Sequence, residues 1–284
     1  AGNPENLRDK ECDPRYRFVL GDICDHSAAR AAMECCDAVL NFAAESHVDR
    51  SIADAKDFVM HGVMGVRVLL DTARSLKIGR FVQIGTDEVY GSIKGAAVSE
   101  DAPLSPSSPY SAAKAAGDLL ALAYFKTHGL PVVVTRSSNN YGPWQHPEKF
   151  IPLFITRGIE GKTLPLYGDG RNIRDWIHVL DNCRAINTVL RAGVPGEVYN
   201  IAGNNERVNI DVALKIASLL GIGEDRIQRV ADRPGHDRRY AIDARKIERL
   251  GFAPSVMFSQ GLRETLEWYR VNRTWWGPQK HTAP

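Results

Sequence analysis

The sequence predicts an α/β protein with a doubly wound parallel sheet, followed toward the C-terminus by a smaller domain of mixed structure. Short apolar runs alternate with longer runs whose apolar residues recur at helical spacing, which is typical of a parallel sheet covered by helices. Polar residues follow one of the buried runs directly. In such folds the carboxyl ends of the strands form the edge at which ligands bind, so the same pattern also places a site.

Most of the predicted sheet comes from the first half of the chain. Three short runs are apolar and rich in β-branched or aromatic residues, as buried strands are: 15–22, 37–43 and 78–86. Three longer runs have helical spacing: 28–33, 56–76 and 110–128. Pro109 suits the first turn of the last helix and Gly129 its end, whereas residues 45–51 are interpreted as a loop.

The second half of the chain adds two more strands and then changes character. Strands are expected over 130–138 and 197–203, with a helix at 181–190 between them. From Asn209 onward the pattern becomes a mixture of short segments, broken by turn signals at 233–235 and 251–254. We therefore expect one domain over 1–145 and 173–203, and a second over 146–172 and 204–284.

The composition argues against several classes of protein. The net charge is only +2, which disfavours nucleic-acid binding through a basic surface, and the Arg-rich turn at 233–239 supports that role poorly. No run of about 18 apolar residues is present, so we expect no membrane span. The 5 cysteines are odd in number and lack CxxC spacing, which indicates reduced thiols in a cytoplasm rather than disulfides or a zinc site.

Two short motifs carry the residues best suited to catalysis. Thr86, Asp87 and Glu88 end the strand at 78–86, while Tyr110 and Lys114 lie one helical turn apart and project from one face of the next helix. A phenol has an ordinary pKa of about 10, which a neighbouring ammonium lowers. Tyr110 can then take a proton from an alcohol while hydride leaves the same carbon for a nicotinamide. The YxxxK pattern alone is weak evidence, and the strand-end threonine strengthens it.

Longer motifs resemble a known family. The chain contains TDEVYG, SPYSAAK, RSSNNYGPWQHPEKFIPLF, PLYGDGRNIRDWIHVLDNC and RPGHDRRY. These are similar to the extended short-chain dehydrogenase/reductases and, within them, to the nucleotide-sugar 4,6-dehydratases, over essentially the whole chain. The resemblance implies a Rossmann-type fold, in which the first domain binds a dinucleotide and the second binds substrate. It further implies NAD as cofactor, dTDP-glucose as substrate and no metal.

The resemblance also implies a set of cofactor contacts. Asp22 and Ile23 would hold the adenine, and small or polar residues in the loop after the second strand would approach the nicotinamide. The full implied set is Asp22, Ile23, Ala43, Ala44, Glu45, Ser46, Tyr110, Lys114 and Asn140. Family members usually have Thr-Asn where this chain has His61-Gly62. The family also opens with a strand and a GxxGxxG turn that would precede Ala1, so we expect the chain to be part of a longer protein.

The implied substrate contacts come mainly from the later motifs. They are Ser46, Thr86, Asn139, Lys149, Phe150, Pro165, Tyr167, Arg174, Asn209, Arg233 and His236. Lys149 and Arg174 are the candidates for a diphosphate, since a guanidinium binds phosphate in a bidentate fork. Tyr167 offers an aromatic face to a pyrimidine, although plain packing would explain it equally well from the residues alone.

The resemblance assigns a role to each catalytic residue. Tyr110, aided by Lys114 and Thr86, deprotonates the carbon-4 hydroxyl as hydride passes to NAD. Glu88 removes the carbon-5 proton, Asp87 protonates the departing carbon-6 hydroxyl, and hydride returns to carbon 6. Two adjacent carboxyls suit this division of labour because one can be protonated while its neighbour is ionised.

Family members also pair two helices into a dimer interface, and this chain is expected to form a homodimer in the same way. The helices at 56–76 and 110–126 carry apolar residues on more than one face: Val66, Leu69, Leu119, Leu122 and Phe125.

Alternative functions stay open from the sequence. A nucleotide-sugar 4-epimerase or decarboxylase on the same scaffold needs no acid–base pair beside the threonine, so Asp87 and Glu88 favour dehydration. A non-catalytic binding protein would follow if the protein truly lacks the Gly-rich loop. The nucleotide base and the downstream pathway also stay open.

Overall fold

Four parallel strands form the central sheet in the order β1-β2-β3-β7. They are β1 (Ala38–Asn41), β2 (Arg80–Thr86), β3 (Val132–Ser137) and β7 (Val198–Ile201). This is a computed structural model that describes residues 2–281. The strands predicted at 37–43, 78–86, 130–138 and 197–203 are confirmed, with trimmed ends. The parallel order explains why these runs are mostly apolar, since helices cover both faces.

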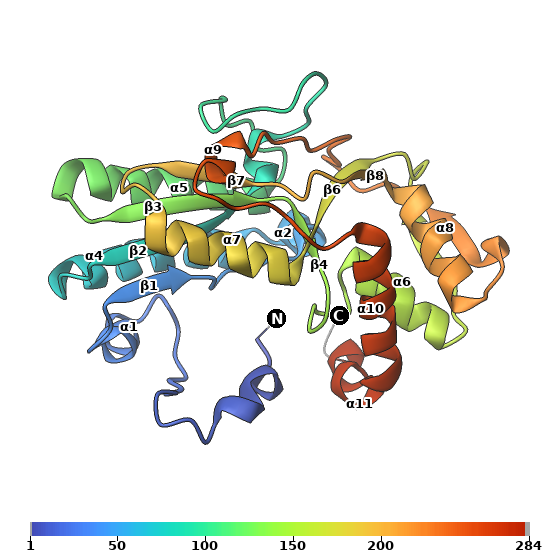
Figure 1. The fold of residues 1–284 in the computed structure, drawn as a ribbon, viewed down its shortest axis with the longest axis horizontal. Coiled ribbons are helices and arrows are strands. Elements are labelled where there is room, and N and C mark those ends of the chain that lie inside the picture. Colours follow the sequence, from blue (N-terminus) through green and yellow to red (C-terminus); the bar gives the residue numbers. More distant parts are fainter. Residues whose placement is uncertain (1, 282–284) are drawn as a thin grey trace.

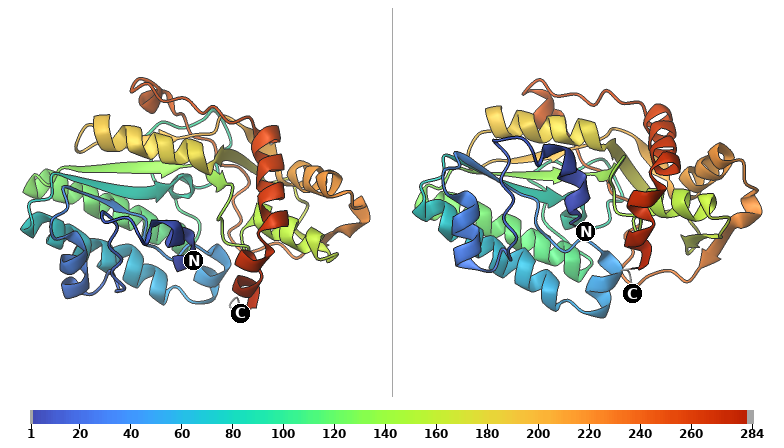
Figure 2. Two further views of the ribbon diagram at one scale, coloured as in Figure 1. Left: turned by 60° about the horizontal axis from the view of Figure 1, so that its bottom comes forward. Right: turned by 90° about the horizontal axis from the view of Figure 1, so that it is seen from below.

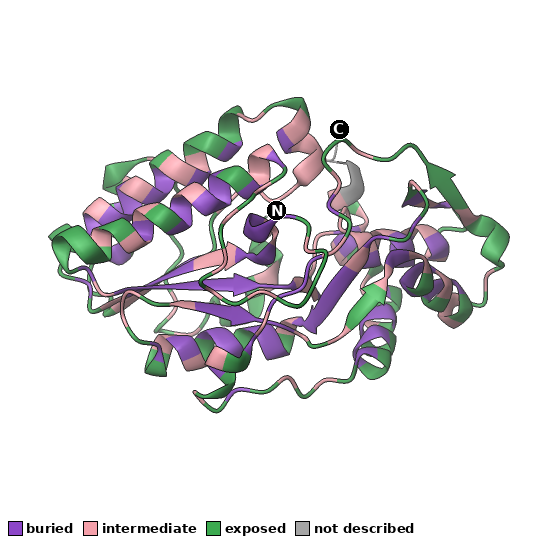
Figure 3. Ribbon diagram, turned by 90° about the horizontal axis from the view of Figure 1, so that it is seen from above, coloured by how far each residue is buried: buried purple, intermediate pink, exposed green. Residues whose placement is uncertain are grey.

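Two layers of helices enclose this sheet (Figures 2 and 3). The helices α4 (Val66–Ser75) and α5 (Pro109–His128) cover one face, and α7 (Val179–Ala192) covers the other. Within β3, Val132 and Val134 join the core beneath α4 and α5, whereas Val133 joins the core beneath α7. This alternation follows from the two-residue period of a strand.

The helix predicted at 56–76 is present but is interrupted by a π-helical segment. It consists of α3 (Lys56–Val59), η2 (Met60–Gly65) and α4. Glycines make a close crossing with α5 possible: a Cβ at Gly117 would lie 2.8 Å from the carbonyl oxygen of Gly62, and one at Gly62 would lie 3.0 Å from the Cβ of Ala113. We call Gly62, Ala113 and Gly117 the small-residue seam.

Helix α5 begins and ends where the sequence predicts. Ser108 and Ser111 form a reciprocal capping box, in which each side-chain oxygen accepts the other residue's backbone N–H at 3.1 Å. Pro109 occupies the first turn, and Gly129 closes the helix in the left-handed conformation at φ 66°. These caps fix the position along the helix axis of the catalytic candidates on its first turns.

A second lobe lies beyond the carboxyl ends of the sheet strands (Figure 1). Its strands form a three-stranded sheet in the order β4-β6-β8 and a pair, β5 with β9. The strands are β4 (Asn139–Tyr141), β5 (Leu164–Tyr167), β6 (Ile173–His178), β8 (Glu206–Val208) and β9 (Ile227–Val230). Its main helices, α6 (Phe150–Ile159), α8 (Asn209–Leu220) and α10 (Phe258–Val271), share one apolar core with these strands.

The remaining elements are short. The α-helices are α1 (His26–Met33), α2 (Val48–Ala53), α9 (Arg245–Glu248) and α11 (Arg273–Trp276). The 3₁₀ turns are η1 (Pro4–Lys10), η3 (Asp87–Tyr90), η4 (Glu224–Arg226) and η5 (Pro278–His281).

The two-domain division stays a prediction, although β6, which was assigned to the first domain, pairs with β4 and β8.

Three expectations about secondary structure are wrong. The run at 15–22 is not a strand: no described strand pairs with it, Leu20 is 88% exposed, and an unpaired segment cannot form a ladder. The loop expected at 45–51 contains the start of α2 at Val48. The region after Asn209 was expected to hold only short segments, but α8 and α10 are full-length helices that bury one face against α6.

Candidate active site

The catalytic candidates meet where β2 ends and the second lobe begins. The backbone turns from β2 into η3 at Thr86, whose hydroxyl oxygen accepts the Glu88 N–H at 3.3 Å. The same hydroxyl donates to Oδ1 of Asp87 at 3.3 Å. Asp87 is only 2% exposed, and its Oδ2 has no hydrogen-bond partner among the described residues. The turn therefore leaves one carboxyl oxygen of Asp87 free for a ligand.

The two carboxyls differ in their electrostatic surroundings. Burial and then the charge of Glu88 raise the pKa of Asp87 well above its ordinary value. Burial also raises the pKa of Glu88, but the cations Arg233, Arg174 and Lys149 oppose that rise. Asp87 consequently holds its proton more firmly than Glu88. This order suits the predicted roles, with Asp87 as acid and Glu88 as base.

Tyr110 and Lys114 lie on the first two turns of α5, facing the end of β2. Lys114 is buried, and its Nζ donates to the carbonyl oxygen of Ile84 in β2. Burial, followed by the charges of Glu88 and Asp87, raises the pKa of Tyr110. The expectation that Lys114 lowers this pKa is not met in this arrangement. The reason is physical: the ammonium is held by the strand, while two carboxyls surround the phenol.

A buried ion pair that was not predicted from the sequence joins α5 to the sheet. Asp118, one turn after Lys114, accepts from Nε of Arg136 at 3.0 Å, and both side chains are almost fully buried. Arg136 also donates to the hydroxyl of Tyr90 at 2.8 Å, which in turn donates to Asn200 at 2.9 Å. Together these bonds tie α5 to β3, η3 and β7. The one sequence signal that could have predicted this ion pair is an acidic residue, Asp118, four positions after the lysine of the YxxxK motif.

A cavity of about 270 Å³ opens beside Glu88, between the end of the sheet and the second lobe. It contains ten of the eleven predicted substrate residues, and the eleventh, Thr86, lies two residues before Glu88. The predicted residues that line it are Ser46, Asn139, Lys149, Phe150, Pro165, Tyr167, Arg174, Asn209, Arg233 and His236. The structure thus brings together residues from five separate stretches of the chain.

The cavity has the polar character of an anion site. Lys149, Arg174 and Arg233 supply three cations, of which Arg174 is 5% exposed. Among the described residues, Oδ1 of Asn139, Oδ1 of Asn209 and Nε of Arg233 are buried without a hydrogen-bond partner. Leaving a buried polar atom unsatisfied costs about 1–3 kcal/mol. The two amide oxygens need donors and the guanidinium nitrogen needs an acceptor, so the cavity is suited to a polar ligand that carries both, with negative charge near the three cations.

Aromatic and ionic contacts shape the outer part of this cavity. Tyr167 is 38% exposed, and its hydroxyl donates to Oδ2 of Asp49 at 3.2 Å. Its ring meets that of His236 edge-on at 6.0 Å, and His236 bonds Asp232 at 2.6 Å. One face of the Tyr167 ring is thus available at the rim. Asp49 was missed by sequence reasoning, since it precedes Tyr167 by more than a hundred residues.

The predicted cofactor residues follow the carboxyl edge of the sheet but do not share one cavity. Asp22, Ile23 and Ala43 line a second cavity of about 400 Å³ beside α1 and β1, whereas Ser46 lines the first. Ala44 and Glu45 lie in the loop between them. Asn140, in β4, already donates its amide N–H to Ser138 at 3.0 Å. An extended dinucleotide fits this row, because small side chains and an exposed carboxylate leave the edge open.

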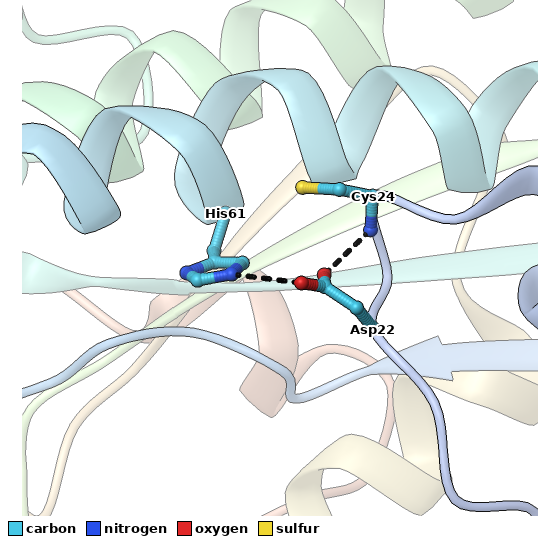
Figure 4. A group of neighbouring side chains, drawn as sticks. All are labelled: Asp22, Cys24 and His61. Atoms are coloured by element: carbon cyan, nitrogen blue, oxygen red, sulfur yellow. Dashed lines mark hydrogen bonds and ion pairs between the residues drawn. The ribbon is translucent and has the colours of Figure 1, made fainter.

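Asp22 belongs to a three-residue group that the sequence analysis did not predict (Figure 4). Its carboxylate accepts the Cys24 N–H at 2.8 Å and lies 3.5 Å from Nε2 of His61, and the ligand-type atoms of the three residues lie within 4.8 Å of one another. Burial and then the charge of Asp22 raise the pKa of the Cys24 thiol, which therefore stays protonated.

Comparison with known proteins identifies the family. A family model described as GDP-mannose 4,6 dehydratase matches residues 1–265, and the chain belongs to this family within the extended short-chain dehydrogenase/reductases. The chain is 54% identical to a dTDP-glucose 4,6-dehydratase of Streptomyces niveus, over 99% of this chain and 84% of that protein. It is 48% identical to the enzyme of the same name from Neisseria meningitidis, over 97% of this chain and 85% of that one.

Solved structures agree with these relatives. The structure of DesIV, a dTDP-glucose 4,6-dehydratase from Streptomyces venezuelae with NAD and TYD bound, has a TM-score of 0.97 at 51% identity, covering 98% of this chain and 87% of that one. A UDP-glucose 4-epimerase from Thermus thermophilus in complex with NAD is less similar, with a TM-score of 0.87 at 26% identity over 93% and 88% of the two chains. The predicted Rossmann-type fold is confirmed, and the dehydratases match better than this epimerase.

Proposed function

We propose that the chain is an NAD-dependent lyase that converts dTDP-glucose to dTDP-4-keto-6-deoxyglucose. The observation that carries this proposal is the pair Asp87 and Glu88, held at the end of β2 next to Thr86 and beside a cavity with three cations. An epimerase or decarboxylase needs oxidation at carbon 4 but no acid–base pair there. The similarity to dTDP-glucose 4,6-dehydratases favours the same choice.

Each catalytic residue then has one role in the reaction. Tyr110 removes the carbon-4 hydroxyl proton, with Thr86 and Lys114 beside it at the end of β2. Bound NAD would supply the acceptor for the carbon-4 hydride and the donor that returns it at carbon 6, and the positive charge of its oxidised ring would favour the phenolate of Tyr110. The new ketone acidifies the carbon-5 proton, which Glu88 accepts and gives back to carbon 5 when hydride adds to carbon 6. Asp87 gives its proton to the departing carbon-6 hydroxyl, which leaves as water.

The acid–base order follows from the environments of the two carboxyls. Catalysis needs Glu88 ionised and Asp87 protonated at the same pH. Burial raises the pKa of both, but the cations near Glu88 limit its rise, whereas the charge of Glu88 adds to that of Asp87. As the pH increases, Glu88 therefore ionises first and in doing so keeps Asp87 protonated. This coupling defines a pH window in which the pair is active.

The charged residues of the cavity suit a nucleotide diphosphate sugar. Arg174 and Arg233 would hold the diphosphate, with Lys149 as a further cation near Glu88. Tyr167, at the rim, would stack on the base, and Asn139 and Asn209 offer their unpaired oxygens to hydroxyl or amide donors. For the cofactor, Asp22 and Ile23 would hold the adenine, and the loop from Ala43 to Ser46, with Asn140, would lie along the remainder.

We expect turnover of dTDP-glucose to a 4-keto-6-deoxy sugar, with a preference over UDP-glucose. A methyl group in an apolar pocket contributes about 1–3 kcal/mol, so the preference in kcat/KM should be about 10- to 200-fold rather than absolute. The measurement is NMR analysis of the product together with kcat/KM for both sugars. A carbon-4 epimer as product would support the epimerase instead, and equal kcat/KM values would contradict the assigned base.

We also propose that the protein is a homodimer that pairs α5 and the α3–α4 helices with those of a second copy. Large apolar side chains are exposed on these neighbouring elements: Val59 at 48%, Met60 at 41%, Met64 at 41%, Leu119 at 56% and Phe125 at 37%. Leu122 is half-buried, whereas Val66 and Leu69, which were also expected to face outward, are buried in the chain's own core. An exposed apolar surface of this kind is typical of a protein interface.

Light scattering at micromolar concentration should give the mass of a dimer. Leu119→Asp should shift the protein toward monomer, because it places a carboxylate in the apolar interface. Leu180→Asp is the matched control, since Leu180 is 62% exposed on α7, on the opposite face of the sheet. A monomer in the unmodified protein, or equal effects of the two substitutions, would contradict this interface.

We further propose that the protein works in the cytoplasm. All five cysteines are free thiols, which agrees with a reducing cytoplasm. Among the helices of residues 2–281, none combines the length and apolar character needed to cross a bilayer.

A further inference from the structure

A chain of hydrogen bonds connects Asp237, which has no assigned catalytic role, to the proposed base Glu88 through Tyr240. Asp237, in the loop after β9, is buried with 7% exposure. Its Oδ2 accepts from the hydroxyl of Ser107 and from the hydroxyl of Tyr240, the latter at 2.9 Å. The Tyr240 hydroxyl also lies 3.4 Å from Oε2 of Glu88. Tyr240 thus stands between two carboxyl groups.

The single proton of Tyr240 can be donated to only one of these carboxyls. The Tyr240 hydroxyl lies 2.9 Å from the Asp237 carboxyl but 3.4 Å from that of Glu88. The shorter distance favours donation to Asp237. Burial and the charge of Glu88 raise the pKa of Tyr240, which keeps this proton in place. With the proton directed toward Asp237, the Glu88 oxygen keeps its lone pair for substrate.

Neighbouring residues fix the positions of the Tyr240 and Asp237 side chains. The Arg174 guanidinium lies over the Tyr240 ring at 4.1 Å and donates to the backbone carbonyl of Asp237 at 2.9 Å. Ser107 fixes the same carboxyl oxygen from the loop before α5. Tyr240 can therefore neither rotate away nor exchange its partner without breaking a buried contact.

We propose that Asp237 is a positioning residue for the dehydration step: it holds the Tyr240 proton away from Glu88 and so keeps Glu88 free to accept the carbon-5 proton. This rests on the proposed function, because it assigns Glu88 the role of base. Asp237 is not among the described residues that line the cavity, so it acts on Glu88, through Tyr240 and through its own charge, and not on substrate.

The same arrangement sets the direction of a pH effect. The charged and titratable groups facing Glu88 are Arg174 from β6, Lys149 before α6, Arg233 and Asp237 from the loop after β9, and Asp87, Tyr110 and Tyr240. The negative charge of Asp237 raises the pKa of Glu88. Asp237→Asn removes this charge and leaves a weaker, neutral acceptor for the Tyr240 hydroxyl, so that its proton can turn toward Glu88. Both changes lower the pKa of Glu88 and make it a weaker base.

The test compares Asp237→Asn, Asp237→Glu and Tyr240→Phe in the full chain with NAD and dTDP-glucose, over a range of pH. We expect Asp237→Asn to lower kcat about 10- to 100-fold, less than the 10²–10⁴ of losing a general base, with KM nearly unchanged. The acidic limb of its kcat profile should move to lower pH, because the active form is ionised Glu88. Asp237→Glu keeps the charge and should recover part of kcat and the position of the limb.

A double-substitution cycle separates positioning from a purely structural role. If Asp237 acts through Tyr240, adding Asp237→Asn to Tyr240→Phe should lower kcat far less than it does in the unmodified protein. An acidic limb that does not move, or losses that multiply in the double variant, would overturn the proposal. Failure of the proposed function is distinguishable, since the unmodified protein would then make no 4-keto-6-deoxy product.

Discussion

Glu88→Gln should leave oxidation at carbon 4 intact and stop the reaction at that point. The amide keeps the shape of the side chain but cannot accept the carbon-5 proton, whereas Tyr110, Lys114 and Thr86 are unchanged. On addition of dTDP-glucose, the absorbance of reduced nicotinamide should appear and persist. Release of the 4-keto-6-deoxy sugar should fall by about 10²–10⁴, the usual cost of losing one positioned base.

Two further observations make this expectation specific. Exchange of the carbon-5 proton with deuterated solvent, measured by NMR, should be lost together with product release. Glu224→Gln, in the exposed η4 turn, provides the matched control and should behave like the unmodified protein. Turnover of Glu88→Gln near the unmodified rate would show that another group removes the carbon-5 proton.

Tyr110→Phe should fail one step earlier. Without the phenol, the carbon-4 hydroxyl loses its assigned base, so neither reduced nicotinamide nor carbon-5 exchange should appear. We expect turnover to fall by about 10²–10⁴ or more, as for the loss of a general base. Stopped-flow absorbance after mixing with dTDP-glucose is the measurement.

Tyr124→Phe is a suitable control for this variant. It makes the same change on the same helix, where the Tyr124 hydroxyl bonds Asp71 at 2.8 Å, away from the cavity. It should cost about 0.5–1.5 kcal/mol of stability and leave turnover in place. If Tyr110→Phe still produced reduced nicotinamide, the assignment of Tyr110 as the carbon-4 base would be wrong.

The sequence predicts the central sheet and the α5 helix well because their signals are local. Pro109 and Gly129 mark the ends of α5 directly. The buried strands are mostly apolar on both faces, which identifies them as strands of a parallel sheet. The substrate cavity was predicted residue by residue through the resemblance. The structure brings these residues together in one cavity, while their individual roles as contacts stay predictions.

The errors and omissions have a different origin, since they depend on partners distant in sequence. The run at 15–22 has the composition of a strand, but a strand exists only where a neighbour offers hydrogen bonds. Asp237 looks like part of a solvated basic turn in RPGHDRRY, and only folding places it against Ser107 and Tyr240. The pKa of Tyr110 was misjudged for the same reason: helical spacing shows Lys114 but not the carboxyls across the site.

The small-residue seam links two properties of this protein that are usually considered separately. The helix that carries Tyr110 rests on the π-helical segment through Gly62, Ala113 and Gly117, with contacts too close to admit another methyl group. The outer side of the same two elements carries the exposed apolar residues of the proposed subunit interface. The alignment of the phenol and the proposed association of subunits therefore both depend on this close contact between helices. A sequence change that reshapes this surface for a different partner must preserve the seam, or it displaces the catalytic helix as well.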